Sequence, residues 1–456
     1  MAAERPNVLF ITLDDMNFDS VGVYGSKVPD TTPNLDQLAA GGFRFDHAHV
    51  TIAICQPTRA VWMTGRYPHT NGALGFDRIN DDVPTLPETL RANGFYTGIL
   101  GKTSHVIPSR TKAFEYSRGS DEMMRGRSQE RYAQFTAEFL KVAKRTGRPF
   151  FLMVNANDPH HPFDNRKPAS EREVSDAPVM ERTYNGDFPA PSRIYQPDEV
   201  VVPGFVPDLP EVREEMAQYY SSVRRADDVV GRVLAELMSA GFADNTVVML
   251  KSDHGIALPF AKTNVWRHST RTPWIIRWPG VLEPGSVDTE HLVSGIDFAP
   301  TVLDILGIEA MAGMNGQSIL PLLVDKEQTD RQFVFTQMNR TVAKTDYVMR
   351  SVQSKRFGLI WNAWSDGETE FDNAPAVRSM TWAAMTAAAE SDPMIARRVQ
   401  HFLYRVPFEF YDYENDPHGL NNLIDNPAFG DLIETYRNKL VEDMRSTGDF
   451  ALQQWQ

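Results

Sequence analysis

The feature that most constrains the fold is a set of short apolar segments that end in acidic residues. The segments are residues 8–13, 149–155 and 246–251. They are rich in Val, Leu, Ile, Phe and Met, as expected for strands buried on both faces of a parallel sheet. Asp14 and Asp15, Asp158, and Asp253 follow them. Open α/β sheets bind ligands at the carboxyl ends of their strands, so we expect these side chains to gather there.

Helical patterns lie between these segments. One helix, which ends near Gly241, carries apolar residues three and four positions apart, at Val223, Ala226, Val230, Val233 and Leu237. A shorter helix is predicted over residues 33–42, closed by glycines in the left-handed conformation. Strands that alternate with helices predict an α/β fold, with a large, mixed but mostly parallel sheet sandwiched by helices.

The character of the sequence changes after about residue 321. Short strands are predicted at residues 347–352, 357–361 and 409–413, and a terminal helix at 427–445. These elements predict a smaller subdomain with an antiparallel sheet, so we expect a catalytic domain over residues 1–325 and a C-terminal α+β subdomain over 326–456. Residues 164–203, rich in Pro, Asp and Arg, are predicted to form a long loop of the kind that is often functional.

Charge and hydropathy exclude several classes of partner. The chain has 456 residues, and its 46 basic and 60 acidic side chains leave a net charge of -14, which disfavours nucleic acid and anionic membranes. No apolar run approaches the roughly 20 residues that span a bilayer. The first residues lack a signal-peptide pattern. We therefore expect a cytoplasmic protein, or a periplasmic or secreted one if a signal peptide has been removed.

Cys55 is the only cysteine of the chain and begins the run C-Q-P-T-R. A lone thiol forms no internal disulfide, so it serves either packing or chemistry. Free cysteine is often a buried, small apolar residue. The polar, turn-forming residues around Cys55 and the guanidinium of Arg59 favour a chemical role, because an arginine stabilises a nearby anion.

The acidic residues at the strand ends have two interpretations. Aspartates after a strand often cap a turn or a following helix. Asp14, Asp15 and Asp253, with His254 beside them, instead offer several ligands that converge on one point, which suits a hard divalent cation such as Ca²⁺ or Mg²⁺. Such a cation neutralises the oxygens of a sulfate or phosphate ester and activates the attacking oxygen.

The cysteine run, with W-M-T-G-R at 62–66, resembles the signature of the type I, formylglycine-dependent sulfatases of the alkaline phosphatase superfamily. Further blocks resemble that family in order, at residues 6–15, 32–36, 101–102, 158–160, 252–255 and 277–280. The resemblance implies an alkaline phosphatase-like fold. It also implies that a formylglycine-generating maturation enzyme oxidises Cys55, and that the hydrated aldehyde is the nucleophile.

The resemblance implies a metal site and a catalytic set. Its cation ligands would be Asp14, Asp15, the modified Cys55, Asp253 and His254, with Ca²⁺ as the expected ion and Mg²⁺ as the alternative. Many relatives have Asn where His254 stands. The implied catalytic residues are Cys55, Arg59, Lys102, His105, His160 and Lys262.

These catalytic residues have distinct implied roles. Arg59 and Lys102 would hold the formylglycine and share its charge. His105 would take a proton as sulfate leaves, although it stands one residue further from Lys102 than is usual in the family. His160 and Lys262 would contact the sulfuryl group and assist the leaving group.

Within the family, several blocks resemble the branch that contains the heparan sulfamidases. They lie at residues 202–207, 262–264, 349–352, 404–405 and 409–412. The predicted function is hydrolysis of a sulfate ester or N-sulfo group on a sugar. The predicted partners are a sulfated small molecule or glycan and the maturation enzyme.

Other functions remain open at the level of sequence. One is a promiscuous arylsulfatase, or a phosphonate monoester or phosphodiester hydrolase of the same superfamily. Another is a catalytically silent binding protein with the same fold. A third is a metal-dependent phosphatase or phosphomutase that uses Thr58 or Thr51 as the nucleophile.

Overall fold

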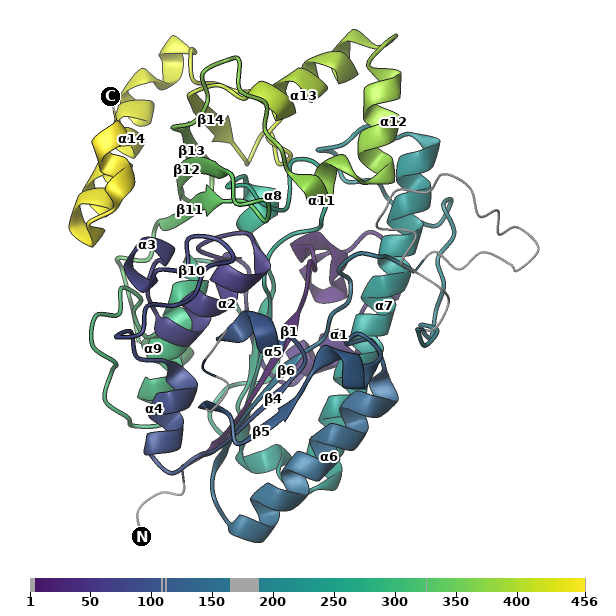
Figure 1. The fold of residues 1–456 in the computed structure, drawn as a ribbon, viewed down its shortest axis with the longest axis vertical. Coiled ribbons are helices and arrows are strands. Elements are labelled where there is room, and N and C mark those ends of the chain that lie inside the picture. Colours follow the sequence, from purple (N-terminus) through teal and green to yellow (C-terminus); the bar gives the residue numbers. More distant parts are fainter. Residues whose placement is uncertain (1–4, 108–109, 111–112, 165–187, 325, 456) are drawn as a thin grey trace.

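The three apolar segments form neighbouring parallel strands at the centre of a sheet (Figure 1). They are β1 (Asn7–Leu13), β6 (Phe150–Asn155) and β7 (Thr246–Ser252). Every residue of the three strands is buried, as expected for strands covered on both faces. The computed structural model describes residues 5–107, 110, 113–164, 188–324 and 326–455.

The main sheet has eight strands in the order β5-β4-β6-β1-β7-β8-β2-β9. The other strands are β4 (Tyr96–Leu100), β5 (Tyr116–Arg118), β8 (Trp274–Arg277), β2 (Phe43–Phe45) and β9 (Ser286–Asp288). Strand β8 runs antiparallel to both β7 and β2, and the other neighbours are parallel. The sheet is therefore mixed and mostly parallel, as predicted. A small parallel pair joins β3 (Ala48–His49) to β10 (Val293–Ser294).

Helices cover both faces of the main sheet (Figure 1). On one face, Leu9, Ile11 and Leu13 share a core with α1 (Pro33–Ala40), α6 (Gln129–Thr146) and α7 (Pro210–Ser239). On the other, Val8 and Phe10 pack with α2 (Cys55–Thr64), α4 (Leu86–Ala92) and α9 (Phe298–Ile305). Shorter helices are α3 (Pro68–Asn71), α5 (Thr103–Val106), α8 (Arg267–Thr270) and α10 (Leu320–Leu323).

The end of α1 differs in one respect from the prediction. Gly41 caps the helix with φ -94°, so the cap is not left-handed. Gly42 is needed for a different reason. A Cβ on Gly42 would lie 2.4 Å from the carbonyl oxygen of Ile276 on β8, so only glycine lets the chain pass this strand.

The C-terminal part forms a second, antiparallel sheet of four strands. They are β11 (Val334–Arg340), β12 (Asp346–Gln353), β13 (Phe357–Asn362) and β14 (Phe408–Asp412). The helices here are α11 (Ala374–Val377), α12 (Met380–Ala388), α13 (Pro393–Tyr404) and α14 (Gly430–Thr447). Helix α14 packs on this sheet through Tyr436 and Leu440 (Figure 1). The predicted antiparallel sheet is thus present, whereas the domain division at 325/326 stays a prediction, because residue 325 lies outside the described residues.

Two further predictions concern loops and membranes. In the long loop predicted over 164–203, residues 188–203 form no helix or strand, and residues 165–187 lie outside the described part. Among the described helices, none is long and apolar enough to cross a membrane.

Candidate active site

Three aspartates and one histidine lie where β1 and β7 end. Asp14 and Asp15 follow Leu13, the last residue of β1, and Asp253 and His254 follow β7. The backbone N–H of Asp253 donates to the carbonyl of Leu13 (3.1 Å), and that of Asp15 donates to Asp253 Oδ1 (3.0 Å). All four side chains are fully buried. The two strand ends therefore concentrate three carboxylates in one buried place.

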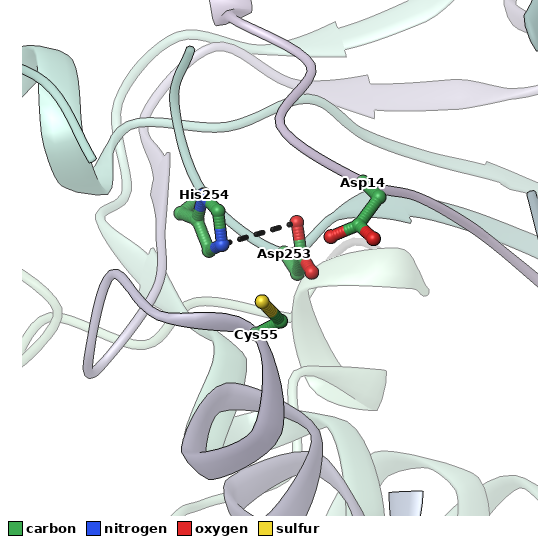
Figure 2. A group of neighbouring side chains, drawn as sticks. All are labelled: Asp14, Cys55, Asp253 and His254. Atoms are coloured by element: carbon green, nitrogen blue, oxygen red, sulfur yellow. Dashed lines mark ion pairs between the residues drawn. The ribbon is translucent and has the colours of Figure 1, made fainter. Parts of the chain in front are cut away.

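Cys55 is the first residue of α2 and faces this acidic group (Figure 2). The preceding residue is extended, so the chain turns into the helix at the cysteine. Pro57 is the third helical residue, where its missing N–H costs no intrahelical hydrogen bond. Cys55 Sγ and ligand atoms of Asp14, Asp253 and His254 all lie within 4.8 Å of one another. The predicted nucleophile thus lies among predicted metal ligands.

The four residues of this group fit a divalent cation. Among the described residues, Nε2 of His254 is buried without a hydrogen-bond partner, and the buried oxygens of Asp14 have only the charged groups of Lys102 and Arg59 beside them. Such atoms are costly, and coordination of a cation would satisfy them. Asp15 lies outside the group, because its oxygens accept from Lys262 Nζ at 2.7 and 3.0 Å. Its role as a ligand stays a prediction.

The guanidinium of Arg59 ties the cysteine helix to the ends of three strands. It lies one turn after Cys55 and has no exposed surface. Nη2 donates to Asp253 Oδ2 (2.9 Å), while Nη1 donates to Thr12 Oγ1 (2.8 Å) and Asn155 Oδ1 (2.6 Å). These bonds fix α2 against β1, β6 and β7. Arg59 therefore orients Cys55 as well as bringing positive charge to it.

Two buried lysines neutralise the carboxylates. Lys102 has a left-handed backbone (φ 50°) at the start of α5, and its Nζ forms an ion pair with Asp14. Lys262 forms the ion pair with Asp15 and is only 2% exposed. A buried ammonium is stable only with a charged partner, and Asp15 raises the pKa of Lys262. Two positive charges thus lie close to Cys55, where an anionic substrate would bind.

The two predicted catalytic histidines carry no charge at neutral pH. Burial, and then Lys102, lower the pKa of His105 to about 4. Burial, and then Lys262, lower the pKa of His160 to about 3. In its neutral form His160 donates from Nδ1 to the carbonyl of His161 (2.6 Å), which leaves Nε2 as a proton acceptor. Each imidazole is thus able to take up a proton during a reaction.

The pKa values of the metal-site residues reflect crowded charges. Burial by itself lowers the pKa of His254, but Asp253, Asp15 and a hydrogen bond with Cys55 together outweigh it, and the pKa is raised to about 9. The His254 Nε2 atom lies 3.7 Å from Asp253 Oδ1, the ion pair drawn in Figure 2. Burial, and then Asp14, raise the pKa of Asp253 to about 6. A bound cation would favour the ionised carboxylates and the neutral imidazole that coordination requires.

A buried ionic network that the sequence did not reveal holds the loop of His160. Arg225 on α7 donates to both oxygens of Asp158 (2.6 and 2.9 Å) and to Asp164 (2.5 Å). Arg127 pairs with Asp158 (3.1 Å) and donates to the carbonyl of His160 (2.8 Å). The only signal in the sequence was an arginine beside the apolar positions of a helix. The network fixes where His160 lies relative to the lysines.

Replacement of Arg225 by methionine is expected to lower the free energy of unfolding by about 3 kcal/mol, since two buried carboxylates lose their shared guanidinium. Urea unfolding would measure the loss. The matched control is Arg224→Met, which removes a more exposed arginine from the same helix, with a side chain 15% exposed against 1% for Arg225. An equal loss in both variants would contradict a special role for the network.

The fold and this site together define a class of protein. A mixed, mostly parallel sheet carries at its strand ends a buried cysteine, three aspartates, two lysines and two neutral histidines. This arrangement is that of an alkaline phosphatase-like hydrolase that acts on an anionic ester or amide.

Comparison with known proteins names the family. A family model described as Sulfatase matches residues 6–308, and one described as N-sulphoglucosamine sulphohydrolase, C-terminal, matches residues 253–372. The chain belongs to the sulfatase family. It is accordingly a sulfuric ester hydrolase or a sulfamidase, as the sequence predicted, and that family generally uses a formylglycine and a divalent cation.

Three similar proteins span nearly the whole chain. The human (Homo sapiens) N-sulphoglucosamine sulphohydrolase is 31% identical, covering 98% of this chain and 91% of its own. A solved structure in complex with its substrate D-glucosamine-2-N,6-O-disulfate has a TM-score of 0.72 at 20% identity, covering 98% and 99% of the chains. A phosphonate monoester hydrolase from Silicibacter pomeroyi has a TM-score of 0.69 at 19% identity, covering 98% and 97%.

Proposed function

We propose that this sulfatase removes a sulfate group from a sugar, with an N-sulfo group on a glucosamine unit as the first candidate. The observation that carries the proposal is the 31% identity to the human N-sulphoglucosamine sulphohydrolase over 98% of the chain. A model of the C-terminal part of such enzymes also matches residues 253–372. The buried lysines near Cys55 supply the positive charge that a sulfuryl group requires, and the neutral histidines offer proton acceptors.

The proposed nucleophile derives from Cys55 after oxidation to formylglycine by a maturation enzyme. The hydrated aldehyde supplies two hydroxyls on one carbon, so that one attacks sulfur and the other later expels sulfate. Cys55 Sγ stands where one of these oxygens would lie. Arg59 lies on the same helix as Cys55, and its bonds to Asn155 and Asp253 hold the helix, and with it Cys55 Sγ, beside the carboxylates.

The surrounding side chains have separate proposed tasks. Lys262 would donate to the sulfuryl oxygens and stabilise the charge that develops on them, while Arg59 and Lys102 would hold the formylglycine and share its charge; all three are buried. His105 would accept a proton on the nucleophile side of the site, and its lowered pKa of about 4 keeps it neutral until then. His160 would contact the sulfuryl group and the leaving nitrogen or oxygen. Because Nε2 of the neutral ring only accepts, it would first take up the proton lost by the attacking hydroxyl and then give that proton to the leaving nitrogen or oxygen.

The proposed cation is Ca²⁺, with Mg²⁺ as the alternative. Asp14, Asp15, Asp253 and His254 would hold it together with the modified Cys55. Bound there, the cation would neutralise charge on the substrate oxygens. Three aspartates favour a hard cation with oxygen ligands, and the imidazole of His254 adds one nitrogen.

A substrate panel tests the function. On protein produced with a formylglycine-generating enzyme, kcat/KM for N-sulfoglucosamine is expected to exceed that for 4-nitrophenyl sulfate by roughly 100-fold, because specific polar contacts discriminate strongly. Glucosamine 6-O-sulfate and a phenylphosphonate monoester complete the panel. A peptide mass spectrum around Cys55 confirms that the enzyme is mature.

Each other outcome points to a different function. Fastest turnover of the 6-O-sulfate would show that the substrate is a sugar sulfate ester and not an N-sulfo sugar. Fastest turnover of the phosphonate would show that the protein is a phosphonate hydrolase and not a sulfatase. A mature protein that turns over none of the compounds but binds the sugars would be a silent binding protein.

A further inference from the structure

A second cavity opens where α8 meets the end of the C-terminal sheet. Its volume is about 460 Å³, and none of its lining residues belongs to the catalytic set or the cation ligands. Four basic and two acidic side chains line it, together with two histidines and a tyrosine. We name it the arginine pocket and define it by Arg267, His268, Arg271, Tyr413 and His418.

Two arginines of this pocket lack an acidic partner. Among the described residues, no carboxylate oxygen lies within ion-pair distance of Arg267 or Arg271, although Arg267 is only 8% exposed. Their hydrogen bonds go to backbone carbonyls, from Arg267 Nη1 to Lys355 (3.0 Å) and from Arg271 to Asp46 (2.7 and 3.0 Å). In the described part of the chain, the two guanidinium groups thus have only carbonyls and the rings of Tyr413 and Phe18 as partners, with no carboxylate paired to either.

The other basic residues of the pocket are already neutralised. Lys355 pairs with Glu290 (2.7 Å), and Arg356 pairs with Asp412 (2.8 Å) and Glu414 (3.0 Å). The one remaining acid of the lining is Asp19, which is half-buried. Burial raises its pKa, so its negative charge is less favoured. The unbalanced charge is therefore that of the two arginines.

Several polar atoms of the lining also have no partner. Among the described residues, the buried atoms without a hydrogen bond include Arg267 Nε, His268 Nε2, Tyr413 Oη and His418 Nδ1. The rings of His268 and His418 stack, with centroids 5.6 Å apart. Burial, and then Arg267, lower the pKa of Arg271 to about 9, so the two charges disfavour each other. Buried charges and donors in this state require a negative ligand.

We propose that the arginine pocket binds an oxyanion such as sulfate, as a site separate from the catalytic one. Guanidinium groups bind tetrahedral or carboxylate oxyanions through paired N–H donors, and the tyrosine hydroxyl and imidazoles supply further donors at the same cavity. The anion has two sources. It is either free sulfate, the product of the reaction, or an anionic group carried by the saccharide substrate.

The first test locates the anion. Crystals of the wild-type protein soaked in selenate, a sulfate analogue with an anomalous signal, are expected to show a peak between Arg267 and His418. This measurement needs no variant and no turnover, so it is independent of the proposed function. A peak at Cys55 alone would overturn the proposal.

The second test measures affinity. In equilibrium dialysis with radiolabelled sulfate, Arg267→Gln is expected to weaken binding at this site by about tenfold or more. Tyr413→Phe removes only a hydroxyl and serves if the arginine variant does not fold. The matched control is Arg148→Gln, which lies before β6 and pairs with Glu115 (2.8 Å). Equal sulfate binding in all four proteins would overturn the proposal.

The third test separates the two sources. If the anion belongs to the saccharide, Arg267→Gln is expected to raise KM for a sulfated disaccharide by about tenfold and leave KM for 4-nitrophenyl sulfate unchanged. If it is free sulfate, both KM values stay unchanged while the dialysis difference persists. An equal rise for both substrates would show that the arginine acts on the catalytic site, and would overturn a separate pocket.

Discussion

Replacement of Cys55 by alanine is expected to lower kcat by about 10⁴-fold or more, because it removes the proposed nucleophile. The cysteine is small, 3% exposed and placed at a helix terminus, so the loss of one sulfur atom should leave the fold intact. Steady-state kinetics with the best substrate of the panel measures the first effect. Thermal unfolding measures the second, and a shift of more than a few degrees would point to a structural role instead.

Two threonines near the cysteine, Thr51 and Thr58, provide the control for this prediction. Thr58 donates its hydroxyl to the carbonyl of Ile52, and Thr51 shares a hydrogen bond with Ser294 (3.2 Å). Each threonine is buried and has a structural partner, so Thr58→Val and Thr51→Val should affect stability more than chemistry. Full activity in the Cys55 variant, with loss in a threonine variant, would favour the phosphatase or phosphomutase reaction.

The sequence predicted the central strands well because burial on both faces leaves an unbroken apolar run. The predicted segments 8–13, 149–155 and 246–251 match β1, β6 and β7 within one residue at each end. The short strands β2, β5 and β9, at or next to the edges of the sheet, were missed, because each has three residues and is covered less completely. A strand this short has no periodicity to detect.

Helix α7 is a long element of which the sequence predicted only the second half. Its apolar spacing predicted residues 223–237, whereas the helix begins at Pro210 and ends at Ser239. The missed turns bury Val212, Met216 and Tyr219, and they also make polar contacts with other segments. Glu215 accepts from the backbone N–H of Thr381 (2.8 Å), and the Ser222 hydroxyl accepts from that of Asp164 (2.8 Å). Such contacts come from segments distant in sequence, so no local pattern predicts them.

In the candidate site, too, some residues were predicted from local sequence and others were not. Residues that end central strands or begin a helix were found from the sequence, and the structure brings Asp14, Cys55, Asp253 and His254 within one small group. The residues that orient them were not found. Asn155 is the last residue of a predicted strand, and its bond to Arg59 forms only when β6 lies beside β1. The reacting groups are thus predicted from the sequence, and tertiary contacts supply their alignment.

The remaining large effect concerns the cation. Asp14→Ala is expected to lower affinity for the cation by roughly 100-fold or more and kcat by about 10³-fold, because the change removes a buried charged ligand. Lys102 also loses its carboxylate partner in this variant. Metal content per chain, measured by mass spectrometry of the purified protein, reports cation loss without any assay of turnover.

The matched control for Asp14→Ala is Asp297→Ala, which removes another buried carboxylate, paired with Arg331 at 2.7 Å away from the four-residue group. This control should lower stability and leave the metal content unchanged. Asp15→Ala then decides whether Asp15 is a ligand or only the partner of Lys262. If Asp15 is a ligand, the metal content of this variant falls; if it only pairs with Lys262, the metal content is unchanged. An unaltered calcium or magnesium content in the Asp14 variant would contradict the proposed ligand set, because Asp14 is one of the four residues that the structure brings together.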